Sequence, residues 1–230
     1  MSDIIIFLWI ILSLAVASIM GLLAKKYGSW IGISALAGLA VISNVLASAK
    51  IVKFPFGLHA PAGIIAYMLT FFLMDVLNEI YGKKEALKGA YAGIIAQLVT
   101  VPLIWLTLIW DAAPFMTKEK ISAATIALGL SPRLFIVGLL SFFIGSMLNV
   151  YLFDMLRKAT KGALLWLRSK VSTITGIFVS NIIFIPLGYY GTGVPIANMI
   201  KGHSLVQIMI ALLDTFFVYF VVLALNKKIK

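Results

Sequence analysis

The sequence predicts an all-α protein, a polytopic transmembrane helical bundle of about seven spans. Of its 230 residues 62% are hydrophobic and only 12% are charged, whereas soluble domains carry about a quarter charged residues. Seven stretches reach the length of about 20 mostly apolar residues that a helix needs to cross the hydrocarbon core. The basic residues also gather in alternate connectors, as in multi-pass proteins. We therefore expect the lipid bilayer to be the solvent of this chain.

The expected spans follow the apolar runs along the chain. They lie at 4–24, 31–50, 61–81, 89–110, 133–156, 171–190 and 205–226. The first run is longer than the apolar core of a signal peptide, and its lysines follow it rather than precede it. We interpret it as a retained span.

The basic residues predict the orientation. With the N-terminus outside, the inner segments hold thirteen of the 19 lysines and arginines and the outer segments hold six. Cytoplasmic connectors carry the excess of such residues, so the count favours N-out and C-in. The net charge of +11 is spread over these connectors and forms no concentrated stripe. We expect no nucleic-acid partner.

The composition of three connecting segments predicts their conformation or their position. Residues 111–132 are expected to hold a surface helix, an interfacial helix or a lid. Residues 157–170 interleave leucine and tryptophan with basic residues, which predicts a segment at the level of the lipid headgroups. Residues 53–61 should be extended, because prolines and a glycine interrupt them.

The sequence lacks the motifs of several common enzyme classes. The chain has no cysteine, and it has no phosphate-binding loop, serine-hydrolase motif or zinc-protease motif. His59 and His203 fall in expected outer loops without a second metal ligand nearby, so we interpret them as surface residues. We predict no catalytic residue, no metal and no cofactor, and therefore no enzyme.

Polar residues inside the spans are the candidate functional residues, because they are costly in lipid and usually face a protein interior or a water-filled cavity. Asp75, Asn78 and Glu79 share one face of the third span with Gly82. Other candidates come from the second, fourth, fifth, sixth and seventh spans. They are Asn44, Gln97, Ser146, Asn149, Ser172, Thr173, Ser180, Asn181 and Asp214.

Other interpretations remain open for these residues. Gln97 or Ser146 alone could simply join two helices by a hydrogen bond. Asp75 or Glu79 could form a structural ion pair with Arg133, Arg157 or Arg168. Gly89 and Gly93 form a GxxxG pattern, which indicates close helix packing.

The third span carries a family resemblance. Residues 75–86 read DVLNEIYGKKEA, which resembles the D-x-x-N-E-x-Y-G-x-x-x-A signature of the queuosine precursor transporter family, also called putative vitamin uptake transporters. Further similar pieces follow in the family's order over about 31–226. They are Ser43-Asn44, Pro132-Arg133, Phe153 to Arg157, Trp166 to Arg168, Ser172-Thr173 and Gly176.

The resemblance implies an importer of 7-deazaguanine precursors of modified tRNA nucleosides, such as 7-cyano-7-deazaguanine, in the plasma membrane. It also implies a core of six spans. Residues 31–230 would form that core, and residues 1–30 an extra N-terminal helix with a basic inner loop. The chain departs from the family near Ser180, near Ser146 and Asn149, and in the last span.

A deazaguanine offers N–H donors, an acceptor oxygen and a flat apolar ring, so acids, amides and aromatic side chains in a central pocket would suit it. The candidate binding residues are Asp75, Asn78, Glu79, Asn44, Asn149, Ser180, Asn181, Phe71 and Arg133. Uptake by alternating access is expected. Asp75, Glu79 and Asp214 are the candidates for carrying a coupled proton.

Two other functions remain open. The chain could be the substrate-binding membrane subunit of an ATP-energised vitamin importer, or a structural protein that binds no small molecule. Besides its substrate, the expected partners are the lipid bilayer and a second copy of the chain.

Overall fold

The computed structural model describes residues 3–54, 57–129, 132–193 and 195–224. Their elements are α1 (Asp3–Tyr27), α2 (Trp30–Ala49), β1 (Ile51–Lys53), β2 (His59–Pro61), α3 (Ile64–Tyr81), α4 (Lys83–Ile109), α5 (Lys118–Leu128), α6 (Pro132–Ala159), α7 (Leu165–Tyr189) and α8 (Ile196–Ala224).

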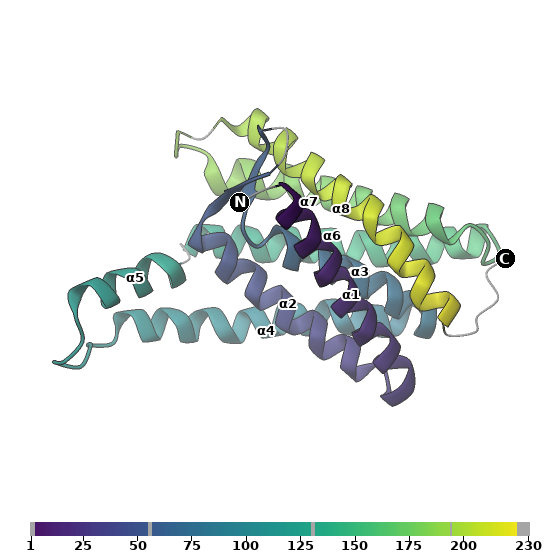
Figure 1. The fold of residues 1–230 in the computed structure, drawn as a ribbon, viewed down its shortest axis with the longest axis horizontal. Coiled ribbons are helices and arrows are strands. Elements are labelled where there is room, and N and C mark those ends of the chain that lie inside the picture. The colour runs from purple at the N-terminus through teal and green to yellow at the C-terminus, as the bar shows by residue number, and fades with distance from the viewer. Residues whose placement is uncertain (1–2, 55–56, 130–131, 194, 225–230) are drawn as a thin grey trace.

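Seven helical stretches of the described residues are long and apolar enough to cross a membrane. They contain α1, α2, α3, α4, α6, α7 and α8, and each overlaps one predicted span. The prediction of an all-α polytopic bundle is therefore confirmed. Figure 1 shows α1 beginning beside the β hairpin and α8 ending at the opposite end of the bundle, as an odd number of crossings requires.

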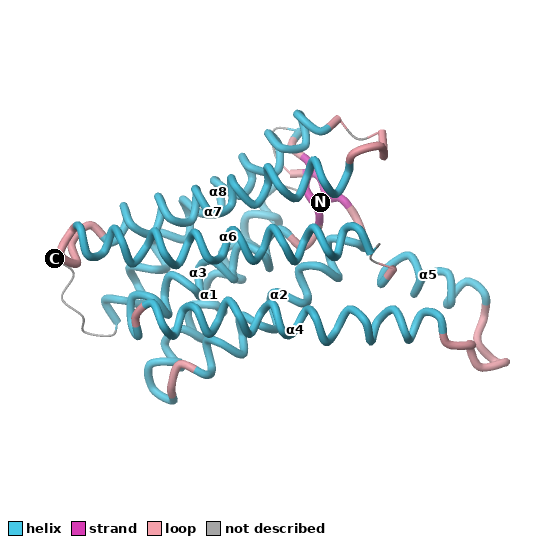
Figure 2. The backbone as a smooth tube through the Cα atoms, turned by 180° about the vertical axis from the view of Figure 1, so that it is seen from behind, coloured by secondary structure: helices cyan, strands magenta, loops and turns pink. Residues whose placement is uncertain are grey.

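Helix α3 is the centre of the bundle. It packs against α1, α2, α4, α6 and α8, and all but a few of its residues are buried. Helices α6 and α7 run side by side, and both views show them together on one side of α3 (Figures 1 and 2). Every other long helix leaves one apolar face exposed, which suits contact with lipid chains.

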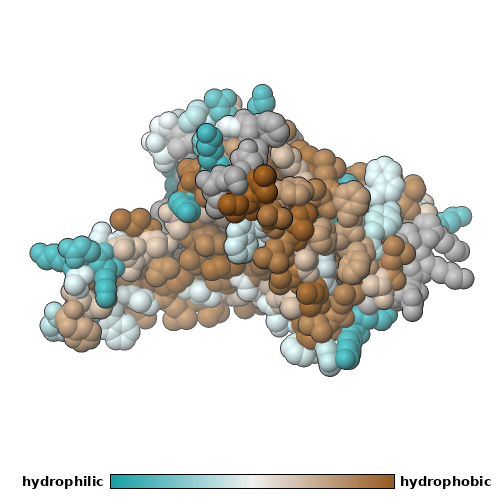
Figure 3. Space-filling model, viewed as in Figure 1, coloured by the Kyte–Doolittle hydropathy of each residue, from teal (hydrophilic) through white to brown (hydrophobic). Residues whose placement is uncertain are grey.

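The surface repeats this division. Apolar side chains cover the middle of the face in Figure 3, and hydrophilic side chains gather at its ends. Large exposed residues such as Phe216, Leu103 and Ile136 belong to this apolar surface. The distribution fits a protein whose middle lies in hydrocarbon and whose ends reach water.

Glycines allow one tight turn between helices and several close helix–helix contacts. Gly82 alone joins α3 to α4, with a φ of 88° that favours glycine. Helices α6 and α7 cross at Gly145 and Gly176, where a β-carbon on Gly176 would lie 2.7 Å from the carbonyl oxygen of Gly145. The predicted close packing at Gly89 and Gly93 is present too: β-carbons there would lie 3.1 Å from Leu36 and from Phe142, respectively.

The hairpin and α5 lie at one end. Residues 51–53 and 59–61 pair in antiparallel register with Val52 opposite Ala60, so the two ends of the stretch 53–61 are extended as expected, while Gly57 lies in a turn with a φ of 71°. Helix α5 has no buried residue among those described. It lies beside α2, where Ser48 Oγ donates to the carbonyl oxygen of Ala127 at 3.1 Å.

Three helices begin well before their predicted starts: α4 at Lys83, α7 at Leu165 and α8 at Ile196, against expected starts at 89, 171 and 205. Helix α7 begins at Leu165, so Arg168 and Lys170 belong to the helix and are buried in the bundle instead of lying in a connector. Both find acidic partners there, and a rule that assigns basic residues to water cannot foresee such pairs. Helix α8 begins at Ile196, so His203 is buried in it instead of exposed in a loop. The neighbouring Gly202 packs close to the backbone of His59 on β2, so this first part of α8 lies against the hairpin.

Candidate functional site

A cavity opens among six helices near the hairpin. Helices α2, α3, α4, α6, α7 and α8 and strand β2 contribute to its wall. It holds about 60 Å³, inside a wider hollow of about 530 Å³ that includes the mouth. The polar side chains that line it are Ser43, Asn44, Tyr67, Gln97, Ser141, Ser180, Asn181 and His203.

Asn44 and Gln97 form one side of the cavity. Asn44 Nδ2 donates to Gln97 Oε1 at 2.5 Å, and Gln97 Nε2 donates to the carbonyl oxygen of Gly93 at 3.1 Å. The other atom of this amide, Asn44 Oδ1, lies near Gly138, which also lines the cavity. A β-carbon on Gly138 would lie 3.6 Å from this oxygen, so the glycine leaves space beside it.

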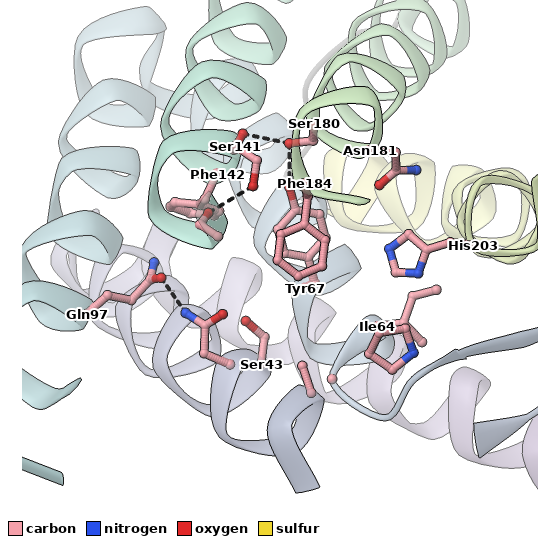
Figure 4. A pocket seen from close by; sticks show the side chains of 15 residues that line it. Ser43, Ile64, Tyr67, Gln97, Ser141, Phe142, Ser180, Asn181, Phe184 and His203 are labelled. Atoms are coloured by element: carbon pink, nitrogen blue, oxygen red, sulfur yellow. Dashed lines mark hydrogen bonds between the residues drawn. The ribbon is translucent and has the colours of Figure 1, made fainter. Parts of the chain in front are cut away.

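Asn181 and His203 form the opposite side. Asn181 Nδ2 donates to Ser204 Oγ at 2.9 Å and to Gln207 Oε1 at 2.7 Å, both on α8. Figure 4 shows the Asn181 oxygen turned toward Tyr67 and Phe184. His203 lies next to it, and Nδ1 of its buried ring has no hydrogen-bond partner among the described residues.

Tyr67, Ser180 and Ser141 form a hydrogen-bonded chain across the cavity. Ser180 Oγ donates to the carbonyl oxygen of Ser141 at 2.6 Å, and Tyr67 Oη lies 2.8 Å from Ser180 Oγ. Because a serine hydroxyl has a single hydrogen, Tyr67 must be the donor to Ser180. The ring of Tyr67 also meets Phe142 edge-on, with centroids 6.0 Å apart.

Phe71 packs behind Tyr67, on the side of the cavity away from the hairpin. It is fully buried, and its ring centroid lies 5.3 Å from that of Tyr67, one turn nearer the hairpin. A β-carbon on Gly176 would lie 3.0 Å from the Phe71 ring. Phe71 does not line the cavity, but it lies one turn from Tyr67 and one turn from Asp75 on the same face of α3, so it stands between the cavity and the acidic part of this helix.

Asp75 lies beyond Phe71 and is held by hydroxyl groups. Ser169 Oγ donates to Asp75 Oδ2 at 2.5 Å, and Thr173 Oγ1 donates to the same oxygen at 3.2 Å. Asn149 Nδ2 donates to Thr173 at 3.0 Å, which links α6 to this group. The other carboxyl oxygen, Asp75 Oδ1, is buried without a hydrogen-bond partner among the described residues.

The other two buried acids have cationic partners. Arg168 Nη2 lies 2.8 Å from Glu79 Oε2 and ties α7 to α3. Lys170 pairs with Asp214 and ties α7 to α8. The alternative of a structural ion pair is therefore realised for Glu79 with Arg168. For Asp75 we find no such pair in the part of the chain that the structure describes.

Asn78 joins α3 to α6. The side-chain nitrogen Nδ2 donates to the backbone carbonyl oxygen of Val150 at 3.1 Å. The backbone carbonyl oxygen of Asn78 accepts from Arg157 Nη1 at 2.8 Å. The end of the bundle opposite the hairpin is thus held together by polar contacts from α3 to α6 and α7, and from α7 to α8.

The predicted site residues divide into two groups. Asn44, Ser180 and Asn181 line the cavity, while Asp75, Asn78, Glu79, Asn149 and Asp214 lie in the polar layer beyond Phe71. Arg133 belongs to neither group: it donates to the carbonyl oxygens of Leu187 and Tyr190 at the end of α7.

Sequence reasoning missed several cavity residues, among them Tyr67, Ser141, Phe142, Phe184 and His203. Tyr67 lies on the same face of α3 as Phe71 and Asp75, at a spacing of four residues. This spacing could have identified Tyr67 as a further candidate. Phe184 follows Ser180 by one turn, and Phe142 adjoins Ser141. His203 was missed because the last span was predicted to begin at residue 205, which placed this histidine in a loop.

A helical bundle with apolar outer faces, buried ion pairs and a cavity lined in part by polar side chains is typical of a multi-pass membrane protein that binds a small molecule. The comparisons agree. Residues 61–221 match the model of the family described as "Putative vitamin uptake transporter", so the chain belongs to that family.

A curated relative from Bacillus subtilis (strain 168), named "Probable queuosine precursor transporter", is 30% identical over 184 residues, which are 80% of this chain and 79% of the relative. No solved structure matches the chain. Membership of a transporter family also agrees with the expectation that the chain is not an enzyme.

Proposed function

We propose that this protein imports a 7-deazaguanine precursor of queuosine or archaeosine, such as 7-cyano-7-deazaguanine, through the cavity between α2, α3, α4, α6, α7 and α8. The observation that carries the proposal is the cavity itself, with amide oxygens on opposite sides and aromatic rings between them. The name of the Bacillus subtilis relative supports the substrate class.

The side chains suit such a base. The free amide oxygens of Asn44 and Asn181 can accept from the N–H groups of the guanine edge. Ser43 and the ring nitrogens of His203 offer further hydrogen bonds. Tyr67, Phe142 and Phe184 supply apolar ring surface for the flat heterocycle.

The size of the cavity supports alternating access. About 60 Å³ holds a few water molecules and is too small for a bicyclic base, so neighbouring helices must separate for the substrate to enter. The far side is closed by Phe71 and by the ion pairs of Glu79 and Asp214. We place the hairpin end outside, as the basic residues predict, so that opening begins on the outer side and the polar layer keeps the inner side closed.

We assign the coupled proton to Asp75. Glu79 and Asp214 have their charges balanced by Arg168 and Lys170, whereas Asp75 is held by two hydroxyls and keeps one oxygen without a partner. Protonation of this oxygen neutralises Asp75, which is the one of these three acids that has no ion pair among the described residues. It also alters the field at the Lys170–Asp214 pair, which interacts electrostatically with Asp75.

The first test is uptake of 7-cyano-7-deazaguanine by liposomes that contain the purified protein. Asn44→Ala and Asn181→Ala should each raise KM about tenfold, because each removes an acceptor for the substrate. Asn198→Ala is the matched control, since this asparagine is exposed on α8, and it should leave KM unchanged. Uptake no greater than that of protein-free liposomes would refute the proposed function.

A further inference from the structure

We propose that the cavity selects for an uncharged substrate. It accepts a 7-deazaguanine whose 7-substituent is neutral, such as the nitrile, and rejects the analogue whose aminomethyl group is protonated. The inference rests on the proposed function and specifies which member of the substrate class this site carries.

The wall of the cavity carries no carboxylate. Among the described residues that line it, none is Asp, Glu, Lys or Arg. His203 is neutral or positive in every protonation state, so it cannot balance a cation. The Tyr67 hydroxyl keeps its hydrogen for Ser180.

The buried acids cannot reach a ligand in this cavity. Phe71 and the close approach of Gly176 to its ring stand between the cavity and Asp75. Glu79 and Asp214 are taken by Arg168 and Lys170. A cation in the cavity would therefore lose its water without gaining a counter-charge, which is strongly unfavourable in a low-dielectric interior.

The polar groups that do face the cavity suit a neutral ligand. The oxygens of Asn44 and Asn181 can accept from N–H donors, and Nδ1 of the buried His203 ring has no hydrogen-bond partner in the part of the chain that the structure describes. An alkylamine resembles the lysine side chain and is protonated at neutral pH. The nitrile carries no charge and can accept a hydrogen bond.

The decisive experiment compares three ligands as competitors of labelled 7-cyano-7-deazaguanine uptake into liposomes: the unlabelled nitrile, the aminomethyl analogue and the hydroxymethyl analogue. The last has nearly the shape of the aminomethyl compound but no charge. We expect the nitrile and the hydroxymethyl compound to compete at similar concentrations. The aminomethyl compound should need a concentration at least about tenfold higher.

The outcomes separate this inference from the proposed function. Equal competition by all three compounds overturns the selection for neutral substrates and leaves the transport function standing. Weak competition by both the hydroxymethyl and aminomethyl compounds assigns the selectivity to shape and also overturns the inference. Absence of saturable nitrile uptake overturns the proposed function itself.

A variant can place a carboxylate in the cavity. Gln97→Glu keeps the oxygen that accepts from Asn44, but its second oxygen replaces the nitrogen that donates to the Gly93 carbonyl, so that bond is lost and the two oxygens repel each other. It should improve competition by the aminomethyl compound relative to the nitrile by about tenfold. An unchanged ratio in a variant that reaches the membrane in normal amount contradicts the proposal.

Gln207→Glu is the matched control for this variant. Gln207 is fully buried on α8 and accepts from Asn181, but it does not line the cavity. The same substitution there should leave the ratio of the two ligands near that of the original protein. An equal gain in both variants would mean that any buried carboxylate suffices, which overturns the role of the cavity wall.

Discussion

At the scale of single residues, three buried acids have three different surroundings. Asp75 has hydroxyl partners, Glu79 has an arginine and Asp214 has a lysine. The sequence placed all three in the membrane but could not distinguish them. Their partners come from α7, at sequence distances of 44 to 98 residues, and helical periodicity does not reach across such distances.

Asp75→Asn and Glu79→Gln should therefore fail in different ways. Asp75→Asn keeps the shape of the side chain and its hydroxyl contacts, so the protein should remain stable, exchange substrate across the membrane and no longer respond to an imposed proton gradient. Glu79→Gln leaves Arg168 buried without its counter-charge, at a cost of about 3–5 kcal/mol. It should lower the melting temperature of the purified protein. Gradient-driven accumulation by Asp75→Asn at the original level would contradict the proton assignment.

Gly138 gives a test of the cavity that spares the fold. A β-carbon there would meet Asn44 Oδ1 and the Phe184 ring at 3.6 Å, an ordinary contact distance. Gly138→Ala should fold normally but occupy space between these groups, and we expect KM for the nitrile to rise roughly tenfold. Gly38→Ala, on an exposed face of α2 with no atom within 4 Å of the new carbon, is the control. If both variants transport alike, the substrate does not lie beside Asn44.

At the scale of helices, the sequence predicted the existence and order of the spans better than their ends. Helices α7 and α8 begin earlier than expected because buried partners satisfy Arg168 and Lys170, and because the hairpin packs against the start of α8. A hydropathy pattern treats a charged or polar residue as the end of a span, since it sees each segment alone. The same limitation hid His203.

The Lys170–Asp214 pair should act as one unit between α7 and α8. Lys170→Met leaves a buried carboxylate without a cation and should destabilise the protein by about 3–5 kcal/mol. Adding Asp214→Leu removes the unpaired charge and should restore most of the lost stability. Thermal unfolding of the detergent-solubilised protein measures both. A double variant as unstable as Lys170→Met would mean that the pair is not the source of the loss.

At the scale of the whole molecule, the polar residues form two layers. The cavity lies near the hairpin, and the ion pairs lie beyond Phe71. Sequence patterns identified the helical face that carries Asp75. They could not predict where along this face the neighbouring helices leave a cavity. The open space lies at the turn of Tyr67, two turns from Asp75, because Phe71 and Gly176 pack closely between them.

The absence of cysteine from the sequence makes this arrangement directly testable. Ser43→Cys places a thiol on the cavity wall, and Ser169→Cys places one beside Asp75 beyond Phe71. A membrane-impermeant thiol reagent added outside should modify Ser43→Cys, with protection by 7-cyano-7-deazaguanine. Ser169→Cys should stay unmodified from that side. The reverse pattern would place the hairpin end in the cytoplasm.

The one-residue connection at Gly82 has a mechanical consequence for any such rearrangement. With helix on both sides of a single residue, α3 and α4 share a hinge and cannot part at that end. Gln97 on α4 and Tyr67 on α3 can then separate only by a scissor-like swing about this hinge, which widens the gap toward the hairpin and leaves the ends near Gly82 together.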